Sequence, residues 1–118
     1  MALDYGLEQE GYFTPERREG TLRAYYRHHL NADPLARAGE QDITAHVNFP
    51  AIQKTGESQG LKTDALISQP QFLTRIVEQL SKNSSAKEWT PTRARQLQTL
   101  VHPEHLGRAF RVLIQSRD

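Results

Sequence analysis

One stretch of this sequence, Gln41–Phe49, alternates apolar and polar residues and therefore restricts what the chain can fold into. Its apolar members are Ile43, Ala45, Val47 and Phe49, and its polar members are Asp42, Thr44, His46 and Asn48. A period of two places each set on its own face of an extended segment. The polar face would carry a carboxylate, a hydroxyl, an imidazole and an amide, without Lys, Arg or Glu. The pattern predicts a strand whose polar face is the wall of a site.

Composition limits the class of protein. The chain has 118 residues, enough for one domain, and 36% hydrophobic residues, which predicts a core that is small or shared with a partner. The net charge of +1 favours neither nucleic acid nor an acidic membrane surface. The absence of cysteine excludes disulfides, zinc thiolate sites and thiol catalysis. No apolar run approaches the roughly 20 residues that span a membrane, so we expect a cytoplasmic protein.

Helices are predicted from their capping signals. Asn48 is placed to cap a helix over residues 49–59, and the sequence at 68–71 combines a serine cap, a proline and a glutamine. The Thr90-Pro91 pair starts a third helix, which His102-Pro103 ends.

Strands are expected on either side of these helices. The strand segments are residues 1–3, 21–26, 61–67 and 109–114. Residues 4–6 are predicted as the loop after the first strand, and residues 7–19 and 28–40 as further loops. Two late strands separated by a pair of helices suit the antiparallel end of a mixed α/β sheet. We therefore predict an α/β fold with about three helices.

Several short motifs occur in a specific order along the chain. They are Asp4-Tyr5-Gly6; Arg18 with Gly20-Thr21-Leu22 and Tyr25–His28; residues 41–47 with Phe49; Ser68-Gln69 with Phe72-Leu73; and Gly107 with Phe110-Arg111-Val112-Leu113. In this combination the chain resembles, over about residues 3–117, the C-terminal part of the MidA-type S-adenosylmethionine-dependent methyltransferases. This family includes the mitochondrial arginine methyltransferase that assists assembly of respiratory complex I.

The resemblance implies a partial domain. Residues 1–118 would form the C-terminal portion of a Rossmann-like methyltransferase fold, without the N-terminal half that binds the cofactor. In such α/β folds, a glycine-rich loop allows close backbone approach and a carboxylate accepts hydrogen bonds from the ribose. None of the seven glycines forms a Gly-x-Gly cluster. S-adenosylmethionine is therefore expected in the complete enzyme and not on this chain alone, which we do not expect to be active by itself.

The resemblance also implies an acceptor-side wall for methyl transfer to protein arginine. Candidate catalytic residues are Asp4, Tyr5, Asp42 and His46, and candidate substrate-binding residues are Arg18, Tyr25, Thr44 and Gln69. A carboxylate, Asp4 or Asp42, would orient a guanidinium through paired hydrogen bonds. In the alternative interpretation, Asp4 makes a turn bond and the Asp42–His46 residues support loops. His102 and His105 have metal-ligand spacing, but Pro103 and the lack of a third ligand lead us to predict no metal site.

The expected partner is a protein substrate, for which a complex I-type subunit is the candidate. An exposed sheet edge would also allow a homodimer. The alternative function is a non-catalytic protein-interaction module with the same fold. The segment from Arg17 to His29 interleaves basic and aromatic residues, as single-strand binders do, but the near-zero net charge argues against nucleic acid. No membrane partner is expected.

Overall fold

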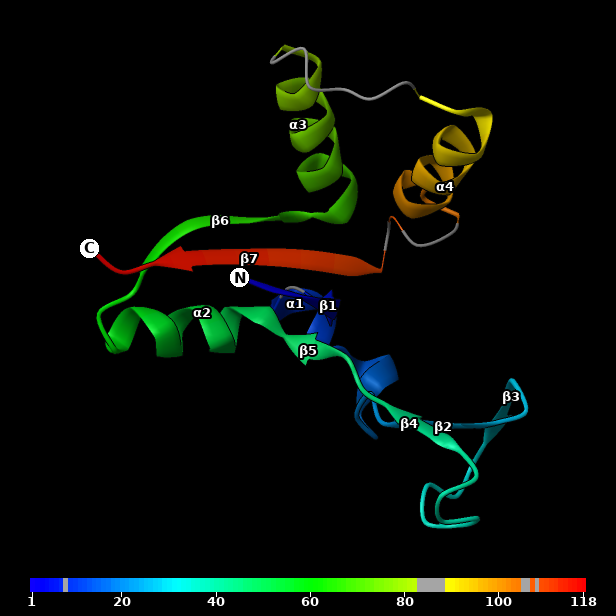
Figure 1. The fold of residues 1–118 in the computed structure, drawn as a ribbon. Helices are drawn as coiled ribbons and strands as arrows, with labels where there is room; N and C mark the ends of the chain where they lie inside the picture. The colour runs from blue at the N-terminus through cyan, green and yellow to red at the C-terminus, as the bar shows by residue number, and fades with distance from the viewer. Residues whose placement is uncertain (8, 83–88, 105–106, 108) are drawn as a thin grey trace.

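The computed structural model describes residues 1–7, 9–82, 89–104, 107 and 109–118, and these form two sheets (Figure 1). The larger sheet has the strand order β5-β1-β7-β6. Its strands are β1 (Ala2–Leu7), β5 (Val47–Asn48), β6 (Lys62–Ser68) and β7 (Phe110–Ser116). β1 is parallel to β5, whereas β7 is antiparallel to both β1 and β6. The prediction of a mixed sheet with an antiparallel end is confirmed.

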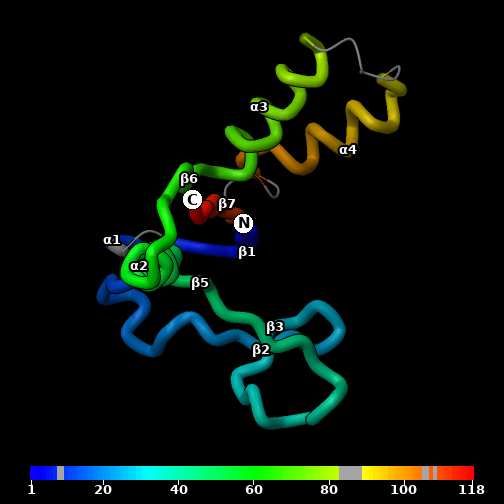
Figure 2. Tube along the Cα trace, turned by 60° about the vertical axis from the view of Figure 1, so that its left-hand side comes forward, coloured from blue at the N-terminus to red at the C-terminus, as the bar shows by residue number. Residues whose placement is uncertain are grey.

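β7 is the centre of the larger sheet. Val112 and Leu113 are 0% and 2% exposed, and as neighbours on a strand they point to opposite faces. Both faces of β7 are therefore covered. In Figures 1 and 2, α2 (Phe49–Ser58) lies on one side of the sheet, and α3 (Gln69–Lys82) and α4 (Pro91–Val101) lie on the other. α2 and α3 contact β6 and β7, and α4 packs on α3.

The three predicted helix starts are confirmed by their hydrogen bonds. Asn48 Oδ1 accepts from the N–H of Ala51 at 3.1 Å, and Thr90 Oγ1 accepts from the N–H of Arg93 at 3.3 Å. At the start of α3, the Ser68 N–H donates to a side-chain oxygen of Gln71 at 3.0 Å, and the Gln71 N–H donates to Ser68 Oγ at 3.4 Å. This reciprocal pair is a capping box. Of the helices within the described ranges, none has the length and apolar character needed to cross a bilayer.

Side-chain hydrogen bonds join α2 to β6 and β7, the antiparallel end of the large sheet. Gln115 Nε2 donates to the Gln53 carbonyl at 3.0 Å and to Thr63 Oγ1 at 3.1 Å. Thr63 Oγ1 in turn donates to Glu57 Oε1 at 2.7 Å. The hydrogen bond from Thr63, followed by that from Gln53, lowers the pKa of the Glu57 carboxyl. A Cβ at Gly56 would meet the terminal amide of Gln115, so the glycine leaves room for this amide and its hydrogen bonds.

A second, smaller sheet extends away from the first (Figure 2). Its strands are β2 (Arg23–Tyr26), β3 (His29–Asn31) and β4 (Asp42–Thr44), in the antiparallel order β3-β2-β4. β3 falls inside the segment predicted as a loop over residues 28–40. The predicted loop over residues 7–19 likewise contains two short helices, α1 (Gln9–Tyr12) and η1 (Pro15–Arg17).

The prediction that Gln41–Phe49 is one strand, with its apolar residues on one face and its polar residues on the other, is wrong. β4 belongs to the small sheet, and β5 pairs with β1 in the large one, so the chain changes sheets at Ala45 and His46. Only the far end of the apolar set is buried: Phe49 is 1% exposed, whereas Ile43 is 57% exposed. Alternation along the sequence does not persist across a break between two sheets.

The prediction that residues 4–6 form a loop after a strand is also wrong. Asp4 and Tyr5 pair with Arg111 and Phe110 of β7, and β1 continues to Leu7. The pairing with β7 joins residues that are far apart in the sequence, so the local Asp-Tyr-Gly pattern does not predict it.

The molecule is more open than a compact domain of its size. Its radius of gyration is 17.6 Å, against about 13.5 Å for a compact chain of this length. Its accessible surface is 9143 Å², about 2,600 Å² more than a compact monomer of this mass exposes. Among the described residues, the buried apolar side chains are only Ala24, Phe49, Val112 and Leu113.

Candidate functional site

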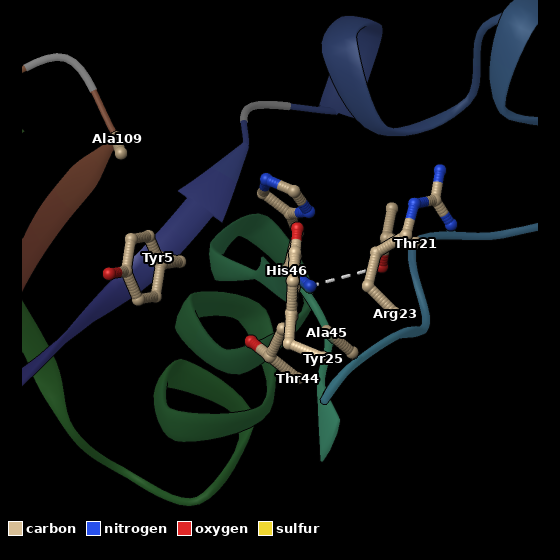
Figure 3. Close-up of a pocket in the computed structure, with 8 residues that line it drawn as sticks. All are labelled: Tyr5, Thr21, Arg23, Tyr25, Thr44, Ala45, His46 and Ala109. Carbon is tan, nitrogen blue, oxygen red and sulfur yellow. Dashed lines mark hydrogen bonds between the residues drawn. The ribbon is translucent and has the colours of Figure 1, made fainter. Parts of the chain in front are cut away.

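A cavity of about 450 Å³ lies where the small sheet meets the C-terminal part of β1 (Figure 3). Its lining residues are Tyr5, Thr21, Arg23, Tyr25, Thr44, Ala45, His46 and Ala109. In Figure 3, Tyr5 and Ala109 lie on one side, Thr21 and Arg23 on the other, and the His46 ring between them. The site is therefore built from both sheets.

The break between β4 and β5 positions His46. The Thr21 side chain is only 6% exposed, and its Oγ1 accepts a hydrogen bond from the His46 N–H at 3.0 Å (Figure 3). A backbone N–H at a break between strands has no ladder partner, and this hydroxyl supplies one. The His46 imidazole is thereby held at the cavity by a fixed backbone.

The small sheet presents one face to the cavity. Arg23 and Tyr25 are two residues apart on β2 and so point the same way, and Thr44 is the cross-strand partner of Arg23 on β4. The Arg23 guanidinium donates to the backbone carbonyls of Leu22 at 2.7 Å and Gly20 at 3.4 Å. Part of its hydrogen-bonding capacity is thus satisfied by its own loop.

Tyr5 is anchored from the large sheet. Its ring centroid lies 4.1 Å from that of Phe110, its partner on β7, with the ring planes tilted by 35°. Tyr5 is still 39% exposed, so it remains accessible from the cavity. Packing on Phe110 favours a single orientation for the ring.

Half of the predicted site residues meet in this cavity. Tyr5 and His46 were predicted as catalytic, and Tyr25 and Thr44 as substrate-binding. They come from three separate segments of the chain and share one space. Their proximity is a finding of the structure, and their chemical roles stay predictions.

The other predicted residues lie outside the lining. Asp4 points to the opposite face of β1 from Tyr5, and its Oδ1 accepts from the Tyr5 N–H at 2.7 Å. Asp42 is exposed on β4, opposite Tyr25. Arg18 is exposed in the turn after η1. Gln69 is 5% exposed, and its Nε2 donates to the Leu100 carbonyl at 2.7 Å, which joins α3 to α4.

Four lining residues were not predicted as site residues: Thr21, Arg23, Ala45 and Ala109. Arg23 carried a usable signal, because a period of two from Tyr25 places it on the same face. Thr21 gains its role only through the long-range contact with His46, which no local pattern reveals. Sequence analysis predicted no metal site at His102 and His105, and His105 lies outside the described residues.

The lining suits an acceptor more than a nucleoside cofactor. It contains one imidazole, one guanidinium and two phenols, and no carboxylate that could accept hydrogen bonds from ribose hydroxyls. The imidazole can take a proton, and two tyrosine rings can hold a planar cation. The residues of this cavity therefore do not fit S-adenosylmethionine by themselves.

Comparisons with known proteins identify the family of the chain. Residues 1–67 match the model of a family described as "Putative S-adenosyl-L-methionine-dependent methyltransferase". No curated protein matches the chain. A crystal structure from Burkholderia thailandensis, described as a "likely methyl transferase" bound to S-adenosyl-homocysteine, is 36% identical with a TM-score of 0.78. It matches over 98% of this chain and 30% of its own length.

A native crystal structure of an uncharacterised protein of the same superfamily, also from Burkholderia thailandensis, is 36% identical with a TM-score of 0.79. The match covers 98% of this chain and 32% of that protein. The chain thus spans about a third of the length of each of these two structures.

Proposed function

Because this chain belongs to the S-adenosyl-L-methionine-dependent methyltransferase family, we propose that it forms the acceptor side of a methyl-transfer site. In this proposal another part of the enzyme binds the cofactor. The observation that carries the proposal is the composition of the cavity, which offers a proton acceptor and two aromatic rings but no carboxylate to accept hydrogen bonds from ribose hydroxyls. The cofactor would supply the methyl group, and this chain would hold and deprotonate the acceptor.

The free edge of β1 supports the placement of the second part. β1 pairs with β7 over residues 2–5 on one side, while β5 covers only Gly6 and Leu7 on the other. Along the described part of the chain, the outer edge of residues 2–5 therefore has no neighbouring strand. The excess accessible surface of about 2,600 Å² is also of the size that obligate interfaces bury. A strand of the cofactor-binding part would lie along β1, and pairing of two copies at this edge is the competing arrangement.

His46 is the proposed general base. A nucleophile attacks a methyl group in line, and it must be held in one orientation and lose its proton. The Thr21 contact fixes the His46 backbone, so a ring nitrogen of His46 is available at a set position to take that proton. Tyr5 and Tyr25 would position the acceptor between them.

The proposed acceptor is an arginine of a protein, with a complex I-type subunit as the candidate substrate. A guanidinium is planar and stacks on tyrosine rings, and Tyr5 and Tyr25 both line the cavity. Asp42 is directly opposite Tyr25 and is the carboxylate closest in register to the cavity face. It would orient the guanidinium as the acceptor enters.

A non-catalytic interaction module is the second candidate function. Leu22, Leu30 and Ile43, all on or beside the small sheet, are 51%, 63% and 57% exposed. Leu30 pairs with Tyr25 and Ile43 with Ala24, so these two side chains lie on opposite faces of the small sheet. Each face thus exposes an apolar side chain that a protein partner would cover. In this case the chain would bind a protein without modifying it.

The two candidates are separated by locating the transferred methyl group. A chimera would carry residues 1–118 in place of the matching third of the Burkholderia thailandensis protein, and would be incubated with S-adenosyl-L-methionine and a complex I subunit preparation. Mass spectrometry should then find methylated arginine. Methyl groups on lysine, on carboxylates or on small molecules would contradict the arginine proposal. If the chimera binds S-adenosyl-homocysteine but methylates nothing, the interaction module is favoured.

A further inference from the structure

A second cavity, of about 310 Å³, lies at the other end of the small sheet. Its lining residues are Tyr26, Arg27, His29, Leu30, Asn31 and Arg37. None of them lines the first cavity. Tyr25 and Tyr26 are neighbours on β2 and point to opposite faces, so one strand serves both cavities.

Two guanidinium groups meet at the ring of Tyr26. The central carbon of the Arg37 guanidinium lies 4.3 Å from the ring centroid, and that of Arg27 lies 5.2 Å away. Both distances are within the range of cation–π attraction. Tyr26 thus has two guanidinium groups as cation–π partners, and both arginines line the same cavity.

The backbone holds both arginines in uncommon conformations. Arg27, His28 and Arg37 have φ values of 48°, 66° and 50°, and these are the non-glycine residues with positive φ among those the structure describes. Arg27 and His28 form the two-residue turn between β2 and β3, a position where asparagine and glycine are the easy choices. Backbone conformations of this kind cluster at active sites and ligand-binding sites.

The loop that carries Arg37 is built around Gln41. Its side-chain NH₂ donates to the carbonyls of Asp33, Pro34 and Ala36, and its side-chain oxygen accepts from Asn31 Nδ2 at 2.8 Å. This network ties the loop to β3. The Arg37 side chain is therefore presented from an ordered scaffold.

The charges around Arg27 and Arg37 are only partly balanced. Arg37 has one counter-ion, Glu40, at 3.7 Å, and both side chains are more than half exposed, so this pair is weak and easily replaced. In the described part of the chain, Arg27 has no carboxylate within ion-pair distance. The two guanidinium groups can together donate several hydrogen bonds to one oxyanion.

We propose that this cavity binds a carboxylate of an acidic protein segment that has an apolar residue beside the acidic one. Arg27 and Arg37 would hold the carboxylate, and Leu30, which lines the cavity and is 63% exposed, would contact the apolar neighbour. A long polyanion such as nucleic acid is disfavoured by the net charge of +1 and by three carboxylates on or beside the small sheet, those of Asp33, Glu40 and Asp42. The binding does not depend on whether the first cavity takes part in methyl transfer.

The probe is the capped peptide Leu-Glu-Leu-Glu-Leu, titrated into the 118-residue chain while backbone amide signals are followed by NMR. We expect shifts at Tyr26, Arg27 and Arg37, and at least about tenfold weaker binding when both arginines are replaced by glutamine. The matched control is Arg95→Gln on α4, which is exposed and distant in the fold, and which should bind like the parent. Unchanged signals from the large sheet would show that the double variant is folded.

Three results would overturn the proposal. The first is that the same peptide with glutamine in place of glutamate binds as tightly as the acidic one. The second is that the Arg27→Gln/Arg37→Gln variant keeps the affinity of the parent. The third is that inorganic phosphate or a single-stranded oligonucleotide binds at this cavity more tightly than the acidic peptide, in which case the occupant is a phosphate group.

Discussion

Replacing Phe49 with alanine is expected to lower the free energy of unfolding by about 3–5 kcal/mol, the usual cost of removing a large buried aromatic side chain. Phe49 is 1% exposed and is one of the two largest fully buried side chains among the described residues. Its ring lies directly on Gly6 of β1, where a side chain would collide with it. It joins α2 to the parallel part of the large sheet, so its loss would loosen the wall that carries Tyr5.

The measurement is urea unfolding of the 118-residue chain followed by circular dichroism. Phe13→Ala is the matched control, since the same side chain is 70% exposed there and its removal should leave the midpoint nearly unchanged. Stability of small domains is about 5–15 kcal/mol, so Phe49→Ala could leave the chain unfolded without denaturant. Equal midpoints for Phe49→Ala and the parent would show that the core described for α2 and β1 is wrong.

Replacing His46 with alanine is expected to lower the rate of methyl transfer by roughly 10²- to 10⁴-fold, the range for loss of a general base. The experiment uses the chimera with the Burkholderia thailandensis protein, in which the cofactor-binding part is present. S-adenosyl-homocysteine affinity should stay within about twofold of the parent, because His46 lines the cavity that we propose for the acceptor. The His46 backbone, held by Thr21, does not depend on the ring.

Two further variants separate proton transfer from packing. His46→Gln keeps hydrogen bonding and most of the volume but cannot take a proton, so we expect a loss close to that of alanine. His28→Asn, in the turn between β2 and β3, removes an exposed histidine at a position where asparagine tolerates the positive φ. It should be fully active. Full activity of His46→Gln would assign His46 a packing role instead.

The parts of the fold that the sequence predicted well are those with local causes. The helix starts were predicted from their caps, because each cap forms a hydrogen bond to a residue only three positions away. The caps are Asn48, Thr90 and the Ser68–Gln71 pair. The strands at β6 and β7 were predicted because each contains an apolar run, Ala65–Ile67 and Val112–Ile114, after a glycine. The pair of helices between them predicted their place at the antiparallel end of a mixed sheet.

The parts that it missed depend on contacts between distant residues. Ile43 looks like a core residue in an alternating segment, but it pairs with Ala24 in the small sheet and is 57% exposed there, although Ala24 is buried. Gln69 looked like a substrate ligand, and the structure pairs it with a carbonyl 31 residues away. His46 and Tyr25 were chosen for their chemistry, and only the break between β4 and β5 brings them to one cavity.

Calorimetric titration of the 118-residue chain with S-adenosyl-homocysteine tests the central claim most directly. If the chain supplies only the acceptor side, it should give no saturable heat at ligand concentrations where the chimera is fully bound. The cavity has no carboxylate for a ribose, and the chain has no glycine-rich loop. Saturable one-to-one binding with a low-micromolar dissociation constant would contradict the account and place the cofactor on this chain.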